Sequence, residues 1–369
     1  MNRPDDPNRR DFLTGRAIRR KVEQAGDALA DAIVEAGEHR PVPVGHDTIR
    51  LQTRAMACEW SVVMNPGVPR EVMAASDALS LVHGLEAQMT VYRDDSELSR
   101  LNRTAHESPR AVEPGLFALL LACDELAEMT EGAFDATSGP LIALWSRCRE
   151  EGRIPTQAEI DTTREITGMQ RVRLDADAGT VAYEREGVEL NLGAVGKGYA
   201  IDRAVEHLRG EEMADFLVHG GYSSLYAAGD HYGQGGWPVG IRNPLFTEKR
   251  YATLLLADEG MSTSGSNIQY FRHEGKRYGH ILDPRTGWPA EGLLSVTVVA
   301  ATATEADALS TAFYVMGLEK ALEYCDNHRS VGAILIPAPQ RGRALEPVVR
   351  NIAEDRLFFV AADANTSIE

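Results

Sequence analysis

The sequence is short of cysteine and has no long apolar run. Its 369 residues include 4 cysteines, Cys58, Cys123, Cys148 and Cys325, which are widely spaced and form no CxxC pair. We therefore expect buried or inert thiols rather than disulfides or a zinc site. No stretch approaches the roughly 20 apolar residues that a membrane-spanning helix needs, so the sequence predicts no transmembrane segment.

Positive charge is also scarce. The chain has 38 Lys and Arg against 55 Asp and Glu, which gives a formal net charge of −17. A negative field opposes binding to the phosphates of nucleic acid or to an anionic membrane surface, so we expect neither as a partner. A bound dinucleotide would need a local cation, either a metal ion or a few placed Lys and Arg side chains.

The N-terminal segment combines two patterns. Asn8-Arg9-Arg10-Asp11-Phe12-Leu13 resembles a twin-arginine export signal, but the residues after Gly15 are charged, whereas a signal peptide continues with an apolar region. We interpret residues 1–43 as a mobile basic and amphipathic segment with a Pro-containing linker, and residues 44–369 as a single catalytic domain. This interpretation predicts a cytoplasmic protein, with export as the alternative.

Hydrophobic periodicity predicts a mixture of helices and strands. Apolar residues three and four apart favour a helix over residues 70–90. Further helices are expected after Pro114, at 156–167, over 202–209, and from Thr304 to Gly317. The expected strands include residues 48–53, 60–65, 188–192, 216–218, 251–257, 294–300 and 331–337. Because the elements do not alternate strictly as βαβ units, the sequence favours an α+β fold with antiparallel pairing.

A glycine-rich segment, Gly193-Ala194-Val195-Gly196-Lys197-Gly198, lies between a predicted strand and a predicted helix. Glycines let backbone N–H groups approach an anion closely, and a helix N-terminus adds partial positive charge. Lys197 supplies a full charge. The spacing matches neither the P-loop nor the dinucleotide fingerprint, so a plain structural turn stays open as the alternative.

The segment from Tyr278 to Gly287 contains an Asp-Pro-x-x-Gly turn flanked by His280 and Arg285. The turn alone accounts for Asp283, Pro284 and Gly287. It does not account for a histidine, which titrates near neutral pH and commonly transfers protons or contacts phosphate.

Asp307 and Thr311 are four residues apart on a predicted helix and therefore share one face. A carboxylate beside a hydroxyl offers the hard oxygen ligands that Mg²⁺ prefers. In the alternative interpretation, Thr304 caps the helix and Asp307 completes a first turn that resembles a capping box.

Two loops rich in turn residues carry aromatic side chains, Tyr92 in the first and Phe134 in the second. Such rings could stack on a flat ligand. The alternative is that both only fill the core.

Taken together and in this order, these segments resemble the ApbE family of FAD:protein FMN transferases. The resemblance extends from Thr53 to Met316. Its motifs are Tyr92-Arg93-x-Asp95-Ser96-Glu97-Leu98-Ser99-x-Leu101-Asn102, Phe134-Asp135 with Gly139-Pro140-Leu141, Gly196-Lys197-Gly198-Tyr199-Ala200-x-Asp202, Ser262-Thr263-Ser264-Gly265, His280-Ile281-Leu282-Asp283-Pro284-x-Thr286-Gly287 and Ala306-Asp307-Ala308-Leu309-Ser310-Thr311-Ala312. The chain departs from the family pattern at Met56-Ala57-Cys58, usually Met-Gly-Thr, at Tyr222, usually acidic, and at Asn191, commonly acidic.

The resemblance implies an α+β fold in which mixed or antiparallel sheets pack with helices. It also implies Mg²⁺ between the FAD pyrophosphate and the helix that carries Asp307. The metal site would comprise the Ala194 carbonyl, Asp307, Ser310 and Thr311. The FAD site would comprise Met56, Tyr92, Ala133, Phe134, Asp135, Asn191, Lys197 and Leu282. The catalytic residues would be His280, Asp307 and Lys197.

The implied reaction is the Mg²⁺-dependent transfer of FMN from FAD to a Ser or Thr hydroxyl of an acceptor flavoprotein, with release of AMP. One alternative is an FAD pyrophosphatase that also depends on Mg²⁺, in which water replaces the protein hydroxyl. The other is an FAD-binding protein without turnover.

Overall fold

The computed structural model describes residues 47–265, 270–339 and 345–360. The predicted N-terminal segment, residues 1–43, lies outside them. The division of the chain into this segment and a catalytic domain therefore stays a prediction.

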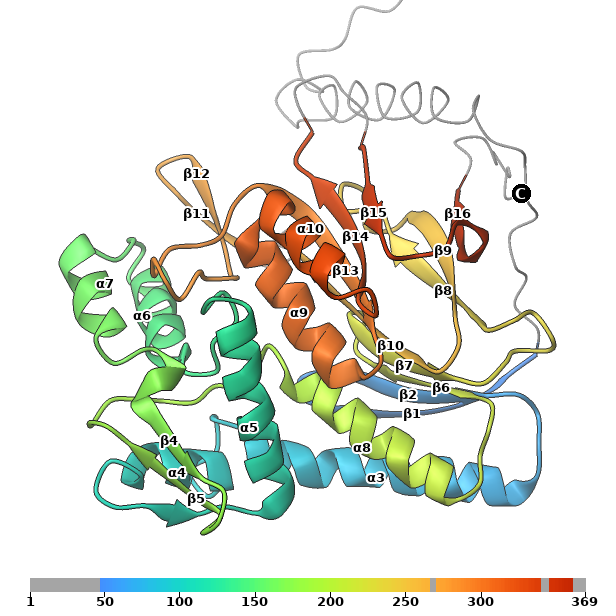
Figure 1. The fold of residues 1–369 in the computed structure, drawn as a ribbon, viewed down its shortest axis with the longest axis horizontal. Coiled ribbons are helices and arrows are strands. Elements are labelled where there is room, and N and C mark those ends of the chain that lie inside the picture. Colours follow the sequence, from blue (N-terminus) through green and yellow to red (C-terminus); the bar gives the residue numbers. More distant parts are fainter. Residues whose placement is uncertain (1–46, 266–269, 340–344, 361–369) are drawn as a thin grey trace, which may run out of the picture.

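An eight-stranded antiparallel sheet forms the centre of the fold, in the order β1-β2-β6-β7-β10-β13-β14-β15 (Figure 1). Its strands are β1 (Ile49–Ala55), β2 (Cys58–Met64), β6 (Phe216–Gly220), β7 (Ser224–Ala228), β10 (Glu259–Gly265), β13 (Leu293–Ala300), β14 (Gly332–Pro337) and β15 (Val348–Arg350). Strands distant in sequence pair here, and Ser262 of β10 lies opposite Ser224 of β7. This pairing brings polar residues from separate segments together.

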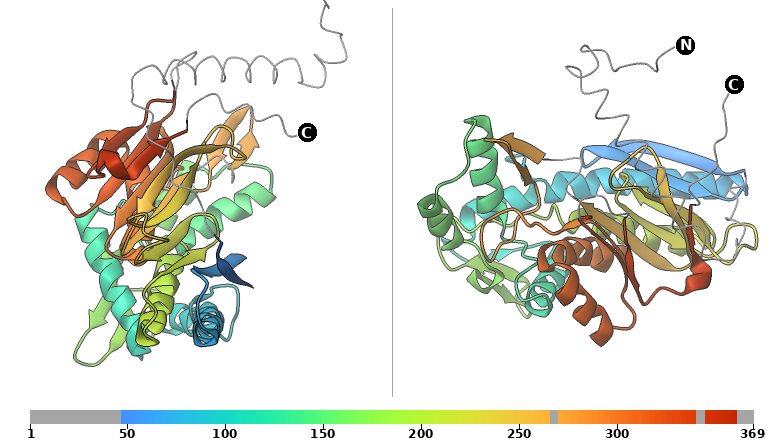
Figure 2. Two further views of the ribbon diagram at one scale, coloured as in Figure 1. Left: turned by 90° about the vertical axis from the view of Figure 1, so that its right-hand side faces the viewer. Right: turned by 90° about the horizontal axis from the view of Figure 1, so that it is seen from above.

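Helices cover one face of the sheet (Figure 2). They are α3 (Pro69–Met89), α8 (Gly196–Gly210), α9 (Ala303–Met316) and α10 (Leu318–Asn327). Because side chains alternate along a strand, Trp60 and Val62 of β2 point to the same face and pack with Val82 of α3 and Ala204 of α8. Burying each large side chain of this kind stabilises the fold by about 1.5–3 kcal/mol.

The opposite face carries a second, three-stranded sheet in the order β16-β9-β8. Its strands are β8 (Trp237–Arg242), β9 (Arg250–Leu256) and β16 (Leu357–Phe359). Leu225 and Ile334 of the central sheet pack with Val239 and Leu254 in the core between the two sheets.

A smaller lobe lies at the left of Figure 1. It contains α4 (Glu97–Thr104), α5 (Pro114–Met129), α6 (Gly139–Glu150), α7 (Gln157–Arg164) and a sheet of β3 (Arg110–Ala111), β5 (Thr180–Tyr183) and β4 (Val172–Asp175). A separate hairpin of β11 (Tyr270–His273) and β12 (Lys276–Gly279) leads to the His280 turn. The antiparallel sheets packed with helices confirm the predicted α+β class.

Most long elements match the sequence prediction, but the glycine-rich segment differs. Gly196, Lys197 and Gly198 form the first turn of α8 rather than a turn that precedes a helix. Helix α6 was not predicted, because Gly139-Pro140 suggests a loop. Proline suits a first helical turn, and a Cβ at position 139 would lie 2.9 Å from the Glu189 carbonyl oxygen.

The prediction of a strand at residues 188–192 is wrong. The side-chain amide of Asn102 takes the place of a neighbouring strand there. Its Nδ2 donates to the Leu190 carbonyl and its Oδ1 accepts from the Leu190 N–H, both at 2.9 Å. The backbone groups are therefore satisfied without a β-ladder.

Candidate active site

Asp307 is a buried carboxylate, 4% exposed, on α9. Its Oδ2 accepts from the Gly198 N–H at 3.0 Å, and its Oδ1 accepts from the hydroxyls of Ser224 and Ser262, each at 2.9 Å. The Lys197 Nζ lies 3.5 Å from the same Oδ1. Burying an unpaired carboxylate would cost several kcal/mol, and these donors offset that cost.

A cluster of hydroxyl groups continues from Asp307 along α9. Ser310 is fully buried, and its Oγ donates to the Asp307 carbonyl oxygen at 2.9 Å. The Ser264 Oγ lies 2.9 Å from the Ser310 Oγ and 3.2 Å from the Thr311 Oγ1. Ser262 and Ser264 face α9 together because alternate residues of a strand share a face. Three of the predicted metal ligands, Asp307, Ser310 and Thr311, therefore lie together.

The position of Lys197 beside Asp307 depends on close packing of α8 on α9. A Cβ at Gly198 would lie 2.2 Å from the Ala303 carbonyl oxygen, so only glycine permits this approach. One turn further along α8, the Asp202 carboxylate accepts from the N–H groups of Ala303 and Thr304, both at 2.8 Å. Burial raises the pKa of the Asp202 carboxyl, while its donors on Thr304 and Ala303 oppose that shift.

The alternative role of Asp307 in a helix cap is wrong. Helix α9 begins at Ala303, and its N-cap is Thr302, whose hydroxyl oxygen accepts from the Glu305 N–H at 3.1 Å. The Thr304 hydroxyl donates to Asp202. Asp307 lies in the second turn, and its carboxylate receives its hydrogen bonds from other elements.

The two predicted aromatic ligands differ in exposure. Tyr92 is 90% exposed, so the interpretation that it only fills the core is wrong. Phe134 is 2% exposed and its neighbour Ala133 is 1% exposed, and both belong to the main core. Packing in the core alone accounts for the burial of Phe134 and Ala133. Their contact with FAD stays a prediction.

Asp135 and Asn191 both use their side chains to hold local turns. The Asp135 Oδ1 accepts from the Thr137 N–H and hydroxyl at 2.7 Å and 2.6 Å, and its Oδ2 accepts from the Met169 N–H at 3.1 Å. Burial raises the pKa of the Asp135 carboxyl against the effect of these donors. The Asn191 Oδ1 accepts from the Gly193 N–H at 2.9 Å.

Met56 lies in the tight turn between β1 and β2. Met56 and Ala57 have φ of 48° and 58°, a conformation that glycine adopts most easily. The Met56 N–H donates to the Glu86 Oε1 at 2.7 Å. Burial raises the pKa of the adjacent Cys58 thiol, and the nearby Lys197 ammonium acts in the opposite direction. The turn that departs from the family pattern therefore lies within electrostatic reach of the lysine of the site.

The turn after β12 is fixed by Asp283. Its carboxylate accepts from the Arg285 Nε at 2.8 Å and from the Arg285 Nη2 at 2.9 Å. The indole N–H of Trp145 on α6 donates to the Gly287 carbonyl at 2.8 Å. Leu282 is half-buried in this turn, and His280 is exposed at its start. A role for His280 in proton transfer stays a prediction.

The sequence analysis assigned no role to Ser224, and it expected the glycines around Gly198 to let backbone N–H groups approach a bound anion rather than Asp307. Both donate a hydrogen bond directly to the Asp307 carboxylate. The alternation of Ser262 and Ser264 was a usable signal, because it predicts two hydroxyls on one strand face. No comparable signal marks Ser224, which reaches Asp307 from another strand.

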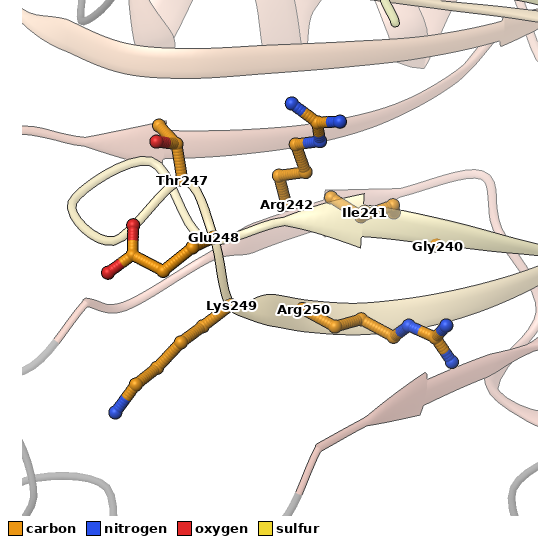
Figure 3. Close-up of a pocket in the computed structure, with 7 residues that line it drawn as sticks. All are labelled: Gly240, Ile241, Arg242, Thr247, Glu248, Lys249 and Arg250. Atoms are coloured by element: carbon orange, nitrogen blue, oxygen red, sulfur yellow. The ribbon is translucent and has the colours of Figure 1, made fainter.

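A shallow hollow of about 520 Å³ lies at the connection of β8 and β9. Figure 3 shows that its walls come from one hairpin and that Arg242, Lys249 and Arg250 point away from one another. None of the predicted site residues lines it. The carboxylate, the lysine and the hydroxyl groups gather around Asp307 instead. The candidate active site therefore lies where α8 and α9 meet.

The sequence model of the ApbE family matches residues 56–335. The chain belongs to the ApbE family. The FAD:protein FMN transferase of Salmonella typhimurium is 35% identical over 243 residues, which are 64% of this chain and 69% of that protein. The FAD:protein FMN transferase of Vibrio cholerae is 28% identical over 301 residues, 80% of this chain and 88% of that protein.

Solved structures of the ApbE family have the same fold. The ApbE protein of Thermotoga maritima has a TM-score of 0.73 at 28% identity and covers 82% of this chain and 97% of its own. The flavin transferase ApbE of Vibrio cholerae has a TM-score of 0.73 at 26% identity, with coverages of 82% and 97%. Within the described residues, no helix combines the length and apolar character that crossing a membrane requires.

Proposed function

We propose that this ApbE-family chain is an FAD:protein FMN transferase, as its relatives are named. The observation that supports this most directly is the Asp307 site. It joins a buried carboxylate on α9, a lysine 3.5 Å away in the first turn of α8, and hydroxyl groups from α9, β7 and β10. Such a site suits phosphoryl transfer, which depends on positioning and charge stabilisation more than on a strong base.

The residues at this site fit a hard dication. Asp307, Ser310 and Thr311 offer oxygen atoms only, and among the described residues no group of three His, Cys, Asp or Glu forms a softer or more highly charged site. With the Ala194 carbonyl, these residues would hold Mg²⁺. When bound, Mg²⁺ would neutralise charge on the FAD pyrophosphate.

The protein's own groups serve the remaining steps. The Lys197 ammonium, in the first turn of α8, binds the pyrophosphate in this proposal. A Ser or Thr hydroxyl of the acceptor attacks the FMN phosphorus, and the bond to the AMP oxygen breaks. His280 takes up the hydroxyl proton in this proposal. Exposed Tyr92 supplies a ring face for the flavin.

The products of FAD separate this function from its alternatives. The protein is incubated with FAD and Mg²⁺, with and without proteins of the source cell, and AMP and covalent FMN are measured by chromatography and in-gel fluorescence. AMP with a fluorescent acceptor band supports the transferase. AMP and free FMN without acceptor indicate a pyrophosphatase, and intact FAD in both samples indicates a binding protein without turnover.

We also propose a cytoplasmic location and a catalytic domain that is independent of residues 1–43. Fractionation of source cells tests the location, because recovery of a shortened chain from the cell envelope would contradict it. A chain that starts at Val44 should keep the full-length FAD affinity, and a large loss would show that the segment docks on the domain.

A further inference from the structure

The turn between β6 and β7 lies at the edge of the candidate active site. Tyr222 in this turn is 71% exposed. The next two residues connect the turn to the site. The Ser223 Oγ lies 3.2 Å from the Ser224 Oγ, and the Ser224 hydroxyl donates to the Asp307 carboxylate. Tyr222 is therefore two residues from a direct contact of the catalytic carboxylate, yet its own ring faces solvent.

Side chains from two strands lie beside this ring, and a third strand carries another arginine on the same face of the sheet. The Arg242 guanidinium, at the end of β8, lies 4.2 Å from the Tyr222 ring centroid. The His219 ring of β6 lies 6.0 Å from it in an edge-on arrangement. Arg50 of β1 lies on the same face of the sheet as His219, because Gln52 and His219 are both in register with Ser61 of β2 and Arg50 is two residues from Gln52. We call Arg50, His219, Tyr222 and Arg242 the rim patch.

The rim patch is positive in a chain that is strongly negative. The whole sequence carries a formal charge of −17. Many of its arginines are neutralised by carboxylates, as Arg209 is by Asp258 and Arg356 by Glu259. In the described part of the chain, Arg50 and Arg242 form no ion pair. Their charge is therefore available to a partner.

We propose that the rim patch docks an acidic segment of the acceptor polypeptide, with carboxylates close in sequence to the hydroxyl that receives FMN. This inference rests on the proposed transferase function. Arg50 and Arg242 would pair with the carboxylates, and the exposed Tyr222 ring would pack on the peptide backbone, as aromatic residues commonly do at interfaces. Local positive charge would also steer an acidic partner past the negative remainder of the surface.

The test uses two synthetic peptides of 12 residues with one central threonine, flanked by Asp and Glu in the first and by Asn and Gln in the second. Fluorescence anisotropy measures peptide binding with FAD present, mass spectrometry measures FMN transfer, and calorimetry measures FAD affinity. The variants are Arg50→Gln, Arg242→Gln and the double variant. Arg173→Gln, an exposed arginine of β4 in the smaller lobe, is the matched control.

We expect the native chain to bind the acidic peptide at least tenfold more tightly than the neutral one. The double variant should lose that preference, while FAD affinity and the Arg173→Gln control stay at the native values. Equal binding of both peptides by the native chain would overturn the proposal. So would a matching loss of FAD affinity in the double variant, because the arginines would then hold the nucleotide.

Failure of the transferase function gives a different result. Charge-dependent peptide binding without FMN transfer would support the rim patch and contradict the function. Transfer to both peptides at equal rates would support the function and contradict the rim patch.

Discussion

Replacing Gly198 by alanine should separate α8 from α9 and so disconnect Lys197 from Asp307. The new Cβ would lie 2.2 Å from the Ala303 carbonyl oxygen and 2.8 Å from the Asp307 Cβ, whereas ordinary contacts begin at 3.4 Å. Both obstacles are backbone or near-backbone atoms, so the helices must move apart by roughly 1 Å. That movement stretches the hydrogen bond from the Gly198 N–H to the Asp307 Oδ2.

The expected loss of stability follows from two opposed effects. Overpacking costs about 1–3 kcal/mol, and alanine regains up to about 1 kcal/mol of helix propensity over glycine. We expect a net loss of about 1–2 kcal/mol in the free energy of unfolding, which lowers Tm by about 2–6 °C. FMN transfer should fall further than stability does, by about 100-fold, because a displacement of roughly 1 Å misaligns the reacting groups.

Gly84 provides the matched control. It lies inside α3, is exposed, and a Cβ there would meet no atom within 4 Å. Gly84→Ala should therefore raise the free energy of unfolding by about 0.5–1 kcal/mol and leave FMN transfer unchanged. Differential scanning calorimetry and a transfer assay on both variants measure the two effects. If Gly198→Ala behaves like Gly84→Ala, the helices do not make the close contact described, and our explanation for the position of Lys197 is refuted.

Four further predictions follow from the site and its surroundings. Lys197→Ala should weaken FAD binding by about 1–3 kcal/mol in calorimetry and leave riboflavin binding nearly unchanged, because riboflavin has no phosphate; an equal loss for both ligands would indicate a structural role. Asp307→Asn should abolish FMN transfer and lower the free energy of unfolding by about 1–3 kcal/mol, because its amide nitrogen would meet a donor; full activity at ordinary Mg²⁺ would refute the site. Ala57→Gly should raise the free energy of unfolding by about 0.5–1 kcal/mol, because it relieves a residue at positive φ, and an unchanged Tm would contradict this. Burial, with Arg50 and Arg242, lowers the pKa of His219 from 6.5 to about 4. The unfolded chain therefore binds the proton first, and stability is lost as pH falls from 6.5 to 4. In urea titrations at pH 7 and pH 5, His219→Gln should remove up to about 2 kcal/mol of this loss, and an identical pH dependence would contradict it.

The sequence was sufficient for the features that depend on local spacing. The apolar stripe of α3 and Pro114 at the start of α5 were predicted because helix periodicity and first-turn proline act within a few residues. Asp307 and Thr311 were placed on one face of a helix for the same reason. Asp307 contacts Ser262 and Thr311 contacts Ser264, and these two serines share one face of β10, which confirms that arrangement.

The features that the sequence did not predict depend on distant partners. Asn102 satisfies the backbone of Leu190, 88 residues away, and so replaces the expected strand pairing. The Ser224 hydroxyl reaches Asp307 across 83 residues. Contacts of this kind follow from the pairing order of the sheet, which no local pattern encodes.

The hydroxyl cluster has a fixed direction of proton donation. Ser224 and Ser262 each have one hydroxyl proton, and both are donated to the Asp307 Oδ1. Ser310 donates its proton to the Asp307 carbonyl, so the Ser264 hydroxyl must be the donor in the contact between these two serines. The Asp307 carboxylate thus orients the O–H dipoles of Ser224 and Ser262 and leaves only their lone pairs for an incoming group. The cluster therefore favours electron-poor guests and repels phosphate oxygens, which leaves the Lys197 ammonium of the neighbouring helix to bind them.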